Sequence, residues 1–132
     1  MFSENVEVVR RLLGAFNDGD FGALNELDAH AELQDEPRIP GAGWNYGYRG
    51  AVDWALKLRQ SFGELSFAID DPSEAGGCVI TRWRAEGQGK RSGVPVHMGG
   101  YCVFGIDGGK VRRVEFFDDE RSAVEAARSR CG

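Results

Sequence analysis

The sequence predicts an α+β fold in which N-terminal helices cover one face of a cone-shaped, curved antiparallel sheet that encloses a pocket. Helical patterns predominate as far as Phe62, and alternating apolar and polar residues, typical of strands, follow from Leu65 to Phe117. The turn Asp107-Gly108-Gly109 predicts a hairpin between the last two strands. Because 132 residues suit one compact domain, we expect residues 1–132 to form a single domain.

The N-terminal half is read as three helices. Ser3 can cap the first helix, and Gly19 can end it. The apolar residues that recur along this helix at helical spacing are Val6, Val9, Leu13 and Phe16. Asp20 can cap a short second helix, with Leu24 and Leu27 on its apolar side, and a third helix is expected from about Gly50 to Phe62.

Between the helices, Ala31 to Asp35 alternate as a short half-buried strand, which places the Asp35 carboxylate on the apolar side. The next segment, Glu36 to Gly50, is rich in Pro and Gly and is expected to be a long ordered loop. Alternating strands then follow, and a last helix is expected from about Asp119 to Ser129. These strands are Leu65–Ile69, Val79–Ala85, Val94–Ile106 and Val111–Phe117.

The composition argues against several classes of partner and site. A formal net charge of −5 argues against binding to nucleic acid or to an anionic membrane. No apolar run approaches the roughly 18 residues of a membrane span, and the first residues read as an amphipathic helix, so we expect a cytoplasmic protein. The three cysteines, Cys78, Cys102 and Cys131, are widely spaced. We therefore expect reduced structural thiols rather than disulfides or a zinc site.

Several motifs occur in a characteristic order along nearly the whole chain. They are Ala15–Asp20 at the end of the first helix, the strand ending at Asp35, Tyr48–Gly50, Val79–Trp83, the turn Asp107–Val111 and the ending Phe117-Asp118. Their order resembles the nuclear transport factor 2-like (NTF2-like) superfamily, and within it the SnoaL-like group of small bacterial proteins. The resemblance implies the cone-shaped fold. It does not imply one activity, because this superfamily contains enzymes, binding modules and transport factors.

Asp35 is the first candidate catalytic residue. Burial at the end of its strand would raise its pKa toward that of a useful base. The resemblance agrees, because in ketosteroid isomerase, a relative, an Asp at the matching strand end moves a proton between carbons of the substrate. The alternative is an Asp that supports the following loop by accepting hydrogen bonds from backbone N–H groups.

The oxyanion donors of ketosteroid isomerase have no strong counterparts in this sequence. Their positions correspond to Leu12 and Cys102. A leucine cannot donate a hydrogen bond and a thiol donates weakly, so steroid-type isomerisation is disfavoured.

Asp118 is the second candidate catalytic residue. In the related limonene epoxide hydrolase, the last Asp of an Asp-Arg-Asp set would match Asp118, but the Arg and its partner fall on Trp83 and Ala85. SnoaL-type polyketide cyclases place an acid near the position of Asp118 as a proton carrier in ring closure. The alternative is that Asp118 caps the final helix together with Asp119.

The expected pocket is apolar and would suit a small apolar or aromatic molecule, without cofactor or metal. Its candidate substrate-binding residues are Leu12, Phe16, Trp54, Trp83, Cys102, Phe104, Val114 and Phe116. Plain core packing is the alternative for most of them. Trp44 and Tyr46 lie in the predicted loop, where they would either close over a ligand or plug the mouth of the cone.

Two functions remain open at this stage. One is a cofactor-independent isomerase, cyclase or hydrolase in which Asp35 transfers a proton. The other is a ligand-binding or dimerisation module without chemistry, in which loop N–H groups occupy Asp35. The resemblance also implies a homodimer through the outer face of the sheet, where His97 and Tyr101 are expected; a protein adaptor would need a further exposed apolar patch.

Overall fold

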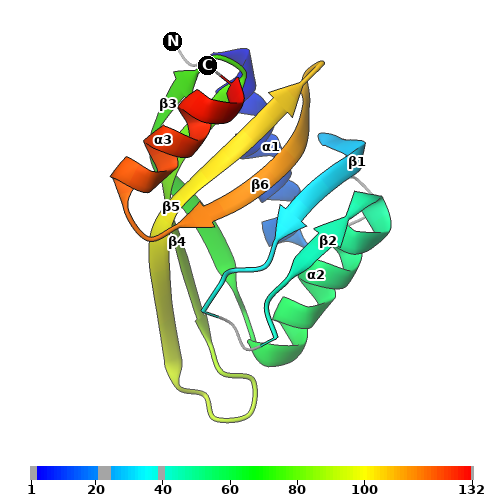
Figure 1. The fold of residues 1–132 in the computed structure, drawn as a ribbon. Helices are drawn as coiled ribbons and strands as arrows, with labels where there is room; N and C mark the ends of the chain where they lie inside the picture. Colours follow the sequence, from blue (N-terminus) through cyan, green and yellow to red (C-terminus); the bar gives the residue numbers. More distant parts are fainter. Residues whose placement is uncertain (1–2, 21–24, 39–40, 132) are drawn as a thin grey trace.

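The computed structural model describes residues 3–20, 25–38 and 41–131, apart from the side chain of Ser61. Within these residues, three helices accompany a six-stranded sheet with the strand order β2-β1-β6-β5-β4-β3 (Figure 1). The elements are α1 (Glu4–Asp18), β1 (Leu27–Gln34), β2 (Trp44–Tyr46), α2 (Gly47–Ser61), β3 (Ser66–Ala75), β4 (Cys78–Gln88), β5 (Pro95–Asp107), β6 (Lys110–Phe117) and α3 (Glu120–Cys131). The predicted α+β class is confirmed.

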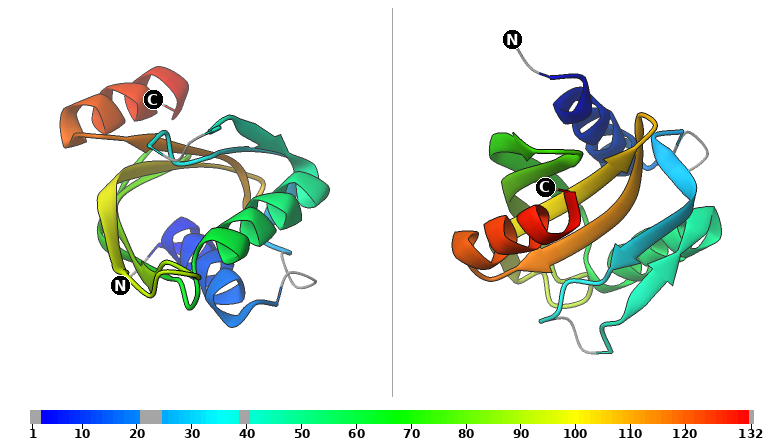
Figure 2. Two further views of the ribbon diagram at one scale, coloured as in Figure 1. Left: turned by 90° about the horizontal axis from the view of Figure 1, so that it is seen from below. Right: turned by 45° about the horizontal axis from the view of Figure 1, so that its top comes forward.

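The sheet is strongly curved, and the helices lie on both of its sides. Seen from below, α1 and α2 lie on the concave side of the sheet and α3 lies on the convex side (Figure 2, left). The main apolar core fills the space between α1, α2 and the concave face. A smaller apolar cluster lies between α3 and the convex face. None of the helices in the described ranges is long and apolar enough to cross a membrane.

Both ends of α1 follow the prediction. The Ser3 hydroxyl accepts a hydrogen bond from the Val6 N–H at 3.2 Å, as an N-cap does. Gly19 ends the helix with a φ of 72°, a left-handed conformation that favours glycine. Val9 and Phe16 are buried against the core, which confirms the predicted apolar stripe.

The segment between α1 and α2 differs from the prediction in two ways. The expected second helix falls partly on residues 21–24, outside the described residues, and Leu27 begins β1 instead of lying on a helix. Within the expected loop, Trp44–Tyr46 form β2, which pairs antiparallel with β1 in the register Leu33↔Asn45. A three-residue strand between glycines is too short to show an alternating pattern.

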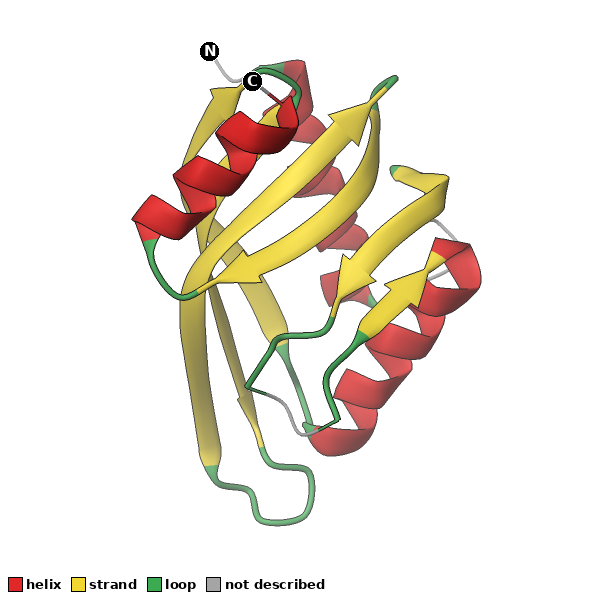
Figure 3. Ribbon diagram, viewed as in Figure 1, coloured by secondary structure: helices red, strands yellow, loops and turns green. Residues whose placement is uncertain are grey.

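The strands β3 to β6 form an antiparallel meander, as predicted (Figure 3). Trp83 in β4 lies opposite Gly100 in β5, and its side chain faces the core. The outward direction of Arg82 and Arg84 is confirmed by their exposure. The turn after β5 contains Gly108 and Gly109 with φ values of 58° and 78°, the left-handed conformations that a tight hairpin of this kind requires.

One strand pairing departs from the predicted antiparallel sheet. β1 pairs with β6 in parallel, in the register Leu33↔Val114. Strands joined by a short hairpin must be antiparallel, but β1 and β6 are far apart in the chain and are under no such restriction. At the end of this pairing the Phe116 N–H donates to Gln34 Oε1 at 2.8 Å.

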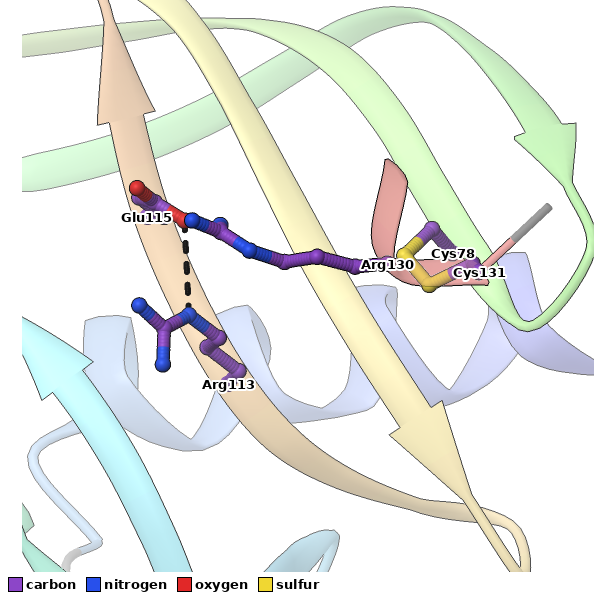
Figure 4. Close-up of a disulfide and its surroundings, with 5 residues drawn as sticks. All are labelled: Cys78, Arg113, Glu115, Arg130 and Cys131. Atoms are coloured by element: carbon purple, nitrogen blue, oxygen red, sulfur yellow. Dashed lines mark hydrogen bonds and ion pairs between the residues drawn. A yellow bond between two sulfur atoms is a disulfide. The ribbon is translucent and has the colours of Figure 1, made fainter. Parts of the chain in front are cut away.

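The last helix is fixed to the sheet by a disulfide, which corrects the prediction of three reduced thiols. Cys131 at the end of α3 is bonded to Cys78 at the start of β4, with Cα atoms 5.7 Å apart (Figure 4). The folding of α3 back over the sheet brings these residues together, and their separation of 53 positions gives no sign of it. A Cβ at Gly76 would overlap the Cys131 carbonyl oxygen, so a glycine is needed there. Cys102 remains a free, buried cysteine.

We expect Cys78→Ser to lower the free energy of unfolding by about 4 kcal/mol on the chain-entropy account of cross-links. The reason is that the disulfide closes a loop with a sequence separation of 53. Urea unfolding of both proteins measures the difference. In dithiothreitol the wild type and the variant should coincide, and equal stabilities without the reductant would contradict a stabilising disulfide.

Candidate functional site

An apolar cavity of about 60 Å³ lies between α1, α2 and the concave face of the sheet. The residues assigned to a pocket from the sequence that line it are Leu12, Phe16, Trp54, Trp83, Cys102, Phe104, Val114 and Phe116. The further lining residues are Leu13, Leu27, Leu33, Gln34, Ala51, Ala55, Phe67, Ala68 and Ile69. The predicted pocket residues thus surround one cavity. Contact of these residues with a ligand stays a prediction.

A second, smaller cavity of about 20 Å³ lies next to the first. The two cavities share four aromatic side chains, which therefore lie between them. These are Trp54, Phe67, Trp83 and Phe116. The centres of the Trp83 and Phe116 rings are 5.4 Å apart in an edge-to-face arrangement, which aromatic pairs favour. Since pockets for drug-sized ligands are several hundred Å³, a larger ligand would enter only if these rings moved.

Trp83 lines both cavities, and its side chain carries a buried polar atom without a partner among the described residues. The side chain is buried, and its indole Nε1–H has no hydrogen-bond acceptor among the described residues. A Cβ added to Gly100 would lie 3.3 Å from this nitrogen, so the indole edge lies against the glycine. A buried donor without a partner costs about 1–3 kcal/mol.

Cys102 and Leu12, which occupy the positions of the isomerase donors, both line the larger cavity. Burial raises the pKa of the Cys102 thiol far above its usual range, because a thiolate is poorly solvated there. The thiol therefore stays neutral, and neither residue provides a strong hydrogen-bond donor to the cavity.

Asp35 is buried directly after β1, but its carboxylate faces the following turn. Oδ2 accepts a hydrogen bond from the Gly43 N–H at 3.0 Å, and Oδ1 accepts one from Asn45 Nδ2 at 2.9 Å. The Asp35 N–H donates in turn to the Gly43 carbonyl at 2.8 Å. Asp35 lines neither cavity among the described residues. This geometry matches the alternative in which Asp35 supports the following loop by accepting hydrogen bonds from it.

Asn45 and Lys57 complete the polar cluster around Asp35, and no pattern in the sequence predicts their position there. Asn45 Oδ1 accepts a hydrogen bond from Lys57 Nζ at 3.2 Å, and Asn45 Nδ2 lies 3.3 Å from the Leu33 carbonyl. Lys57 Nζ lies 3.8 Å from Asp35 Oδ2. A buried Asn within an apparent loop gives no signal of its own in the sequence.

Glu36 is a second residue that sequence reasoning missed, and it lines the smaller cavity. It is 7% exposed. Its Oε2 accepts from the Arg38 N–H at 2.7 Å, and its Oε1 accepts from Arg38 Nε at 2.6 Å. Arg38 Nη2 also donates to the Gly99 carbonyl at 2.8 Å, so Arg38 connects the segment after β1 to β5. The only sequence signal was a second carboxylate directly after Asp35.

Among the described residues, Trp44 and Tyr46 line neither cavity, and their contact with a ligand stays a prediction. Because β2 is a strand, the side chains of Trp44 and Tyr46 point away from the side on which Asn45 is buried. The Trp44 ring stacks on the Arg113 guanidinium, whose central carbon is 4.5 Å from the ring centre. Tyr46 is 64% exposed.

Asp118 follows β6 and is exposed, and it lines neither cavity among the described residues. The cap of α3 falls on its neighbour: Asp119 Oδ1 accepts a hydrogen bond from the Ser122 N–H at 2.7 Å. This hydrogen bond lowers the pKa of Asp119 below its usual value, because it favours the charged carboxylate. The structure thus does not bring Asp118 to the cavity.

No three His, Cys, Asp or Glu side chains gather in the described part of the chain where they could hold a metal ion. The surface that the cavities offer to a ligand is almost entirely apolar.

We expect Asp35→Asn to lower the free energy of unfolding by about 1–3 kcal/mol. An Asn side chain would present an N–H group to the donors on Gly43 or Asn45, where the carboxylate accepts on both oxygens. Urea unfolding followed by circular dichroism measures the change. Asp118→Asn is the matched control and should stay within about 0.5 kcal/mol of the wild type. Equal, small effects of both substitutions would contradict the supporting role of Asp35.

Comparison with known proteins places this geometry in a family. The SnoaL-like domain family matches residues 9–114. The curated proteins include none that matches. Among solved structures, TerC crystallised with polyporic acid is 18% identical, with a TM-score of 0.77 over 96% of this chain and 99% of that chain.

Two further structures share the fold. A candidate polyketide cyclase from Acidithiobacillus ferrooxidans is 18% identical, with a TM-score of 0.75 over 98% of this chain and 97% of its own. A SnoaL-like candidate polyketide cyclase from Jannaschia sp. CCS1 is 21% identical, with a TM-score of 0.73 over 96% and 92%. The chain therefore belongs to the SnoaL-like domain family of the NTF2-like superfamily.

Proposed function

We propose that this protein binds a small apolar or aromatic molecule in the cavity between α1, α2 and the sheet. The observation that carries the proposal is an interior cavity with apolar walls from both helices and from the sheet. Trp83, whose buried N–H lacks an acceptor among the described residues, is one of the residues that line it. A core that served only for stability would gain from filling this space, because each missing methyl group costs about 1 kcal/mol.

Similar structures support binding as the function. TerC was crystallised with polyporic acid, and two neighbours carry the description of polyketide cyclases. We extend from them to this chain only the binding of a small organic molecule. The reaction and the substrate of those proteins do not extend to this chain, because one fold supports many activities when sequence identity is low.

A second candidate function is proton transfer by Asp35, with Asp118, in a cofactor-independent isomerase, cyclase or hydrolase. The observation that favours it is the burial of Asp35 with Lys57 Nζ at 3.8 Å. Such a reaction would require the carboxylate to leave Gly43 and Asn45 and to turn toward the cavity. We place this function second because Asp35 already has donors on both oxygens.

The two candidates are separated by Asp35→Asn, which should abolish turnover in a proton-transfer enzyme. In a binding module the same variant should keep its affinity for the ligand, since Asp35 does not line the cavities.

We expect propylbenzene, used as an apolar probe, to bind the wild type and to raise its unfolding temperature through mass action. Ala55→Leu places a larger side chain on the cavity wall and should weaken binding about tenfold or more. Ala126→Leu makes the same change on α3, away from the cavity, and should leave binding unchanged. Titration followed by ¹H–¹⁵N NMR measures both affinities and confirms folding. Absence of binding to the wild type would refute the proposal.

We also propose that two copies pair through the part of the convex sheet face that α3 leaves uncovered (Figure 3). Tyr101 packs against the cluster under α3, whereas the His97 side chain, further along β5, is 73% exposed. Multi-angle light scattering at micromolar concentration should then give twice the mass of one chain. The mass of a single chain would remove this role for His97; Tyr101, which packs under α3, is already partly withdrawn from that surface.

A cytoplasmic location remains a prediction of the sequence, and the disulfide is the feature that bears on it. Disulfides persist mainly in oxidising compartments. In a reducing cytosol Cys78 and Cys131 would be free thiols, and α3 would lose its covalent link to β4.

A further inference from the structure

The disulfide between Cys78 and Cys131 holds α3 at the end opposite to its connection with β6. α3 follows β6 almost directly, so residues 118 and 119 tie its first turn to the sheet. A helix of this length spans about 18 Å, and Cys131 ties its last turn to β4. If the disulfide opens, α3 stays covalently attached to the sheet through β6 alone.

The apolar packing of α3 against the sheet is slight. The buried residues of α1 include Leu12 and Phe16, whereas the buried residues of α3 are Ala123 and Ala127. Val124 adds a partly buried side chain. Hydrophobic stabilisation grows with the apolar area removed from water, and isolated helices of about 12 residues are marginal in water. Packing alone therefore holds α3 weakly.

Among the described residues, one ion pair joins the side chains of α3 to the sheet. Arg130 of α3 pairs with Glu115 of β6 (Figure 4). The Arg130 side chain is 40% exposed, and exposed ion pairs contribute little to stability. The Asp119 carboxylate that caps α3 accepts from Ser122 of the same helix, so it does not hold α3 to the strands. The disulfide is thus the strongest connection between the last turn of α3 and the sheet.

The disulfide borders a groove of about 280 Å³ beside α3. Cys78 and Cys131 both line this groove, together with Asp107 and Arg112. The side chains of Asp107 and Arg112 are exposed, so the groove opens to solvent. Cys78 is 1% exposed, whereas Cys131 is partly exposed. A thiolate that enters the groove therefore reaches Cys131 more readily than Cys78.

We propose that the bond between Cys78 and Cys131 is a thiol–disulfide exchange site, where reduction by a dithiol releases α3 from the convex face. A thiolate of the dithiol attacks Cys131 Sγ, a mixed disulfide forms, and the bond to Cys78 breaks. Its electron pair passes to Cys78 Sγ, which takes up a proton. The second thiolate of the reductant then displaces Cys131, which takes up a proton as well. The protein gains two electrons and two protons, and the reductant becomes a disulfide.

Release of α3 uncovers the apolar cluster beneath it. This cluster includes Cys78, Ile80 and Val103, with Tyr101 and Phe117 packed against it. Among the described residues, none of these five lines the two cavities under the concave face. The exchange site is therefore independent of the proposed binding function.

The first test measures the rate at which dithiothreitol reduces the disulfide of the wild type in the absence of denaturant. Acid quenching followed by mass spectrometry gives the reduced fraction over time. Because a thiolate from solvent reaches the bond in the folded protein, we expect a rate proportional to the dithiothreitol concentration. A rate that does not depend on this concentration would overturn the proposal, because the bond would then open only after a prior unfolding step.

The second test follows the release of α3 with Cys102 as an internal control. Cys102 is as buried as Cys78 but lines the larger cavity instead of the space under α3. After reduction, iodoacetamide should alkylate Cys78 about tenfold or more faster than Cys102, because α3 no longer covers Cys78. Peptide mass spectrometry measures both rates. Equal protection of the two cysteines would show that α3 stays in place and would overturn the proposal.

Two variants of α3 complete the test. In Cys131→Ser, without reductant, the amides of α3 should lose about tenfold or more of their hydrogen-exchange protection relative to the amides of β5. Ser129→Ala changes an exposed residue of the same helix, keeps the disulfide and should retain the wild-type ratio. The wild-type ratio in Cys131→Ser would overturn the proposal. If Cys131→Ser does not fold, the reduced wild type is measured in its place.

Discussion

The concave face of the sheet is apolar, and the rest of the structure depends on keeping this face away from water. α1 and α2 lie across it (Figure 2), but two helices do not fill the space under a curved six-stranded sheet. Large aromatic side chains from the sheet and from both helices reach into this space, and cavities remain between them. Trp83 shows the consequence, because its ring lies so close to Gly100 that a Cβ there would be 3.3 Å from the indole nitrogen, and its N–H is left without an acceptor among the described residues. The cavity is thus a result of sheet curvature.

The two carboxylates that follow β1 have different surroundings and different hydrogen-bond partners. Asp35 faces the turn and holds it through Gly43 and Asn45. Glu36 borders the smaller cavity, and its carboxylate is held by Arg38. A strand end that looks, in the sequence, like the site of a single catalytic acid therefore contains one acid that supports the backbone and one that borders the cavity. Burial does not distinguish the two residues, because Asp35 and Glu36 are almost equally buried. Their hydrogen-bond partners distinguish them.

Much of the fold is predictable from the sequence, because its signals are local. α1 has a cap and an apolar stripe, β4 to β6 alternate, and the turn glycines have the conformations that a tight hairpin requires. Most of the apolar cavity lining follows from the same alternation. The remaining features depend on contacts between distant segments: the parallel pairing of β1 with β6, the three-residue β2, and the bond between Cys78 and Cys131. The orientation of Glu36 depends on Arg38 and on the Gly99 carbonyl, so no pattern around Glu36 itself predicts it.

Contacts on the convex side of the sheet connect its strands to one another and to α3, independently of the cavities on the concave side. The Arg113 guanidinium stacks on Trp44 of β2 and pairs with Glu32 of β1 and Glu115 of its own strand. Glu115 also pairs with Arg130 of α3, next to the disulfide (Figure 4). Side chains and one covalent bond thus connect β2, β1, β6, α3 and β4 without using any atom of the concave face. The walls of the cavities, in contrast, are mostly apolar side chains, and rotation of a side chain costs far less than separation of paired strands. A ligand larger than the cavities would therefore be accommodated by movement of the rings between them, with the strands remaining in register.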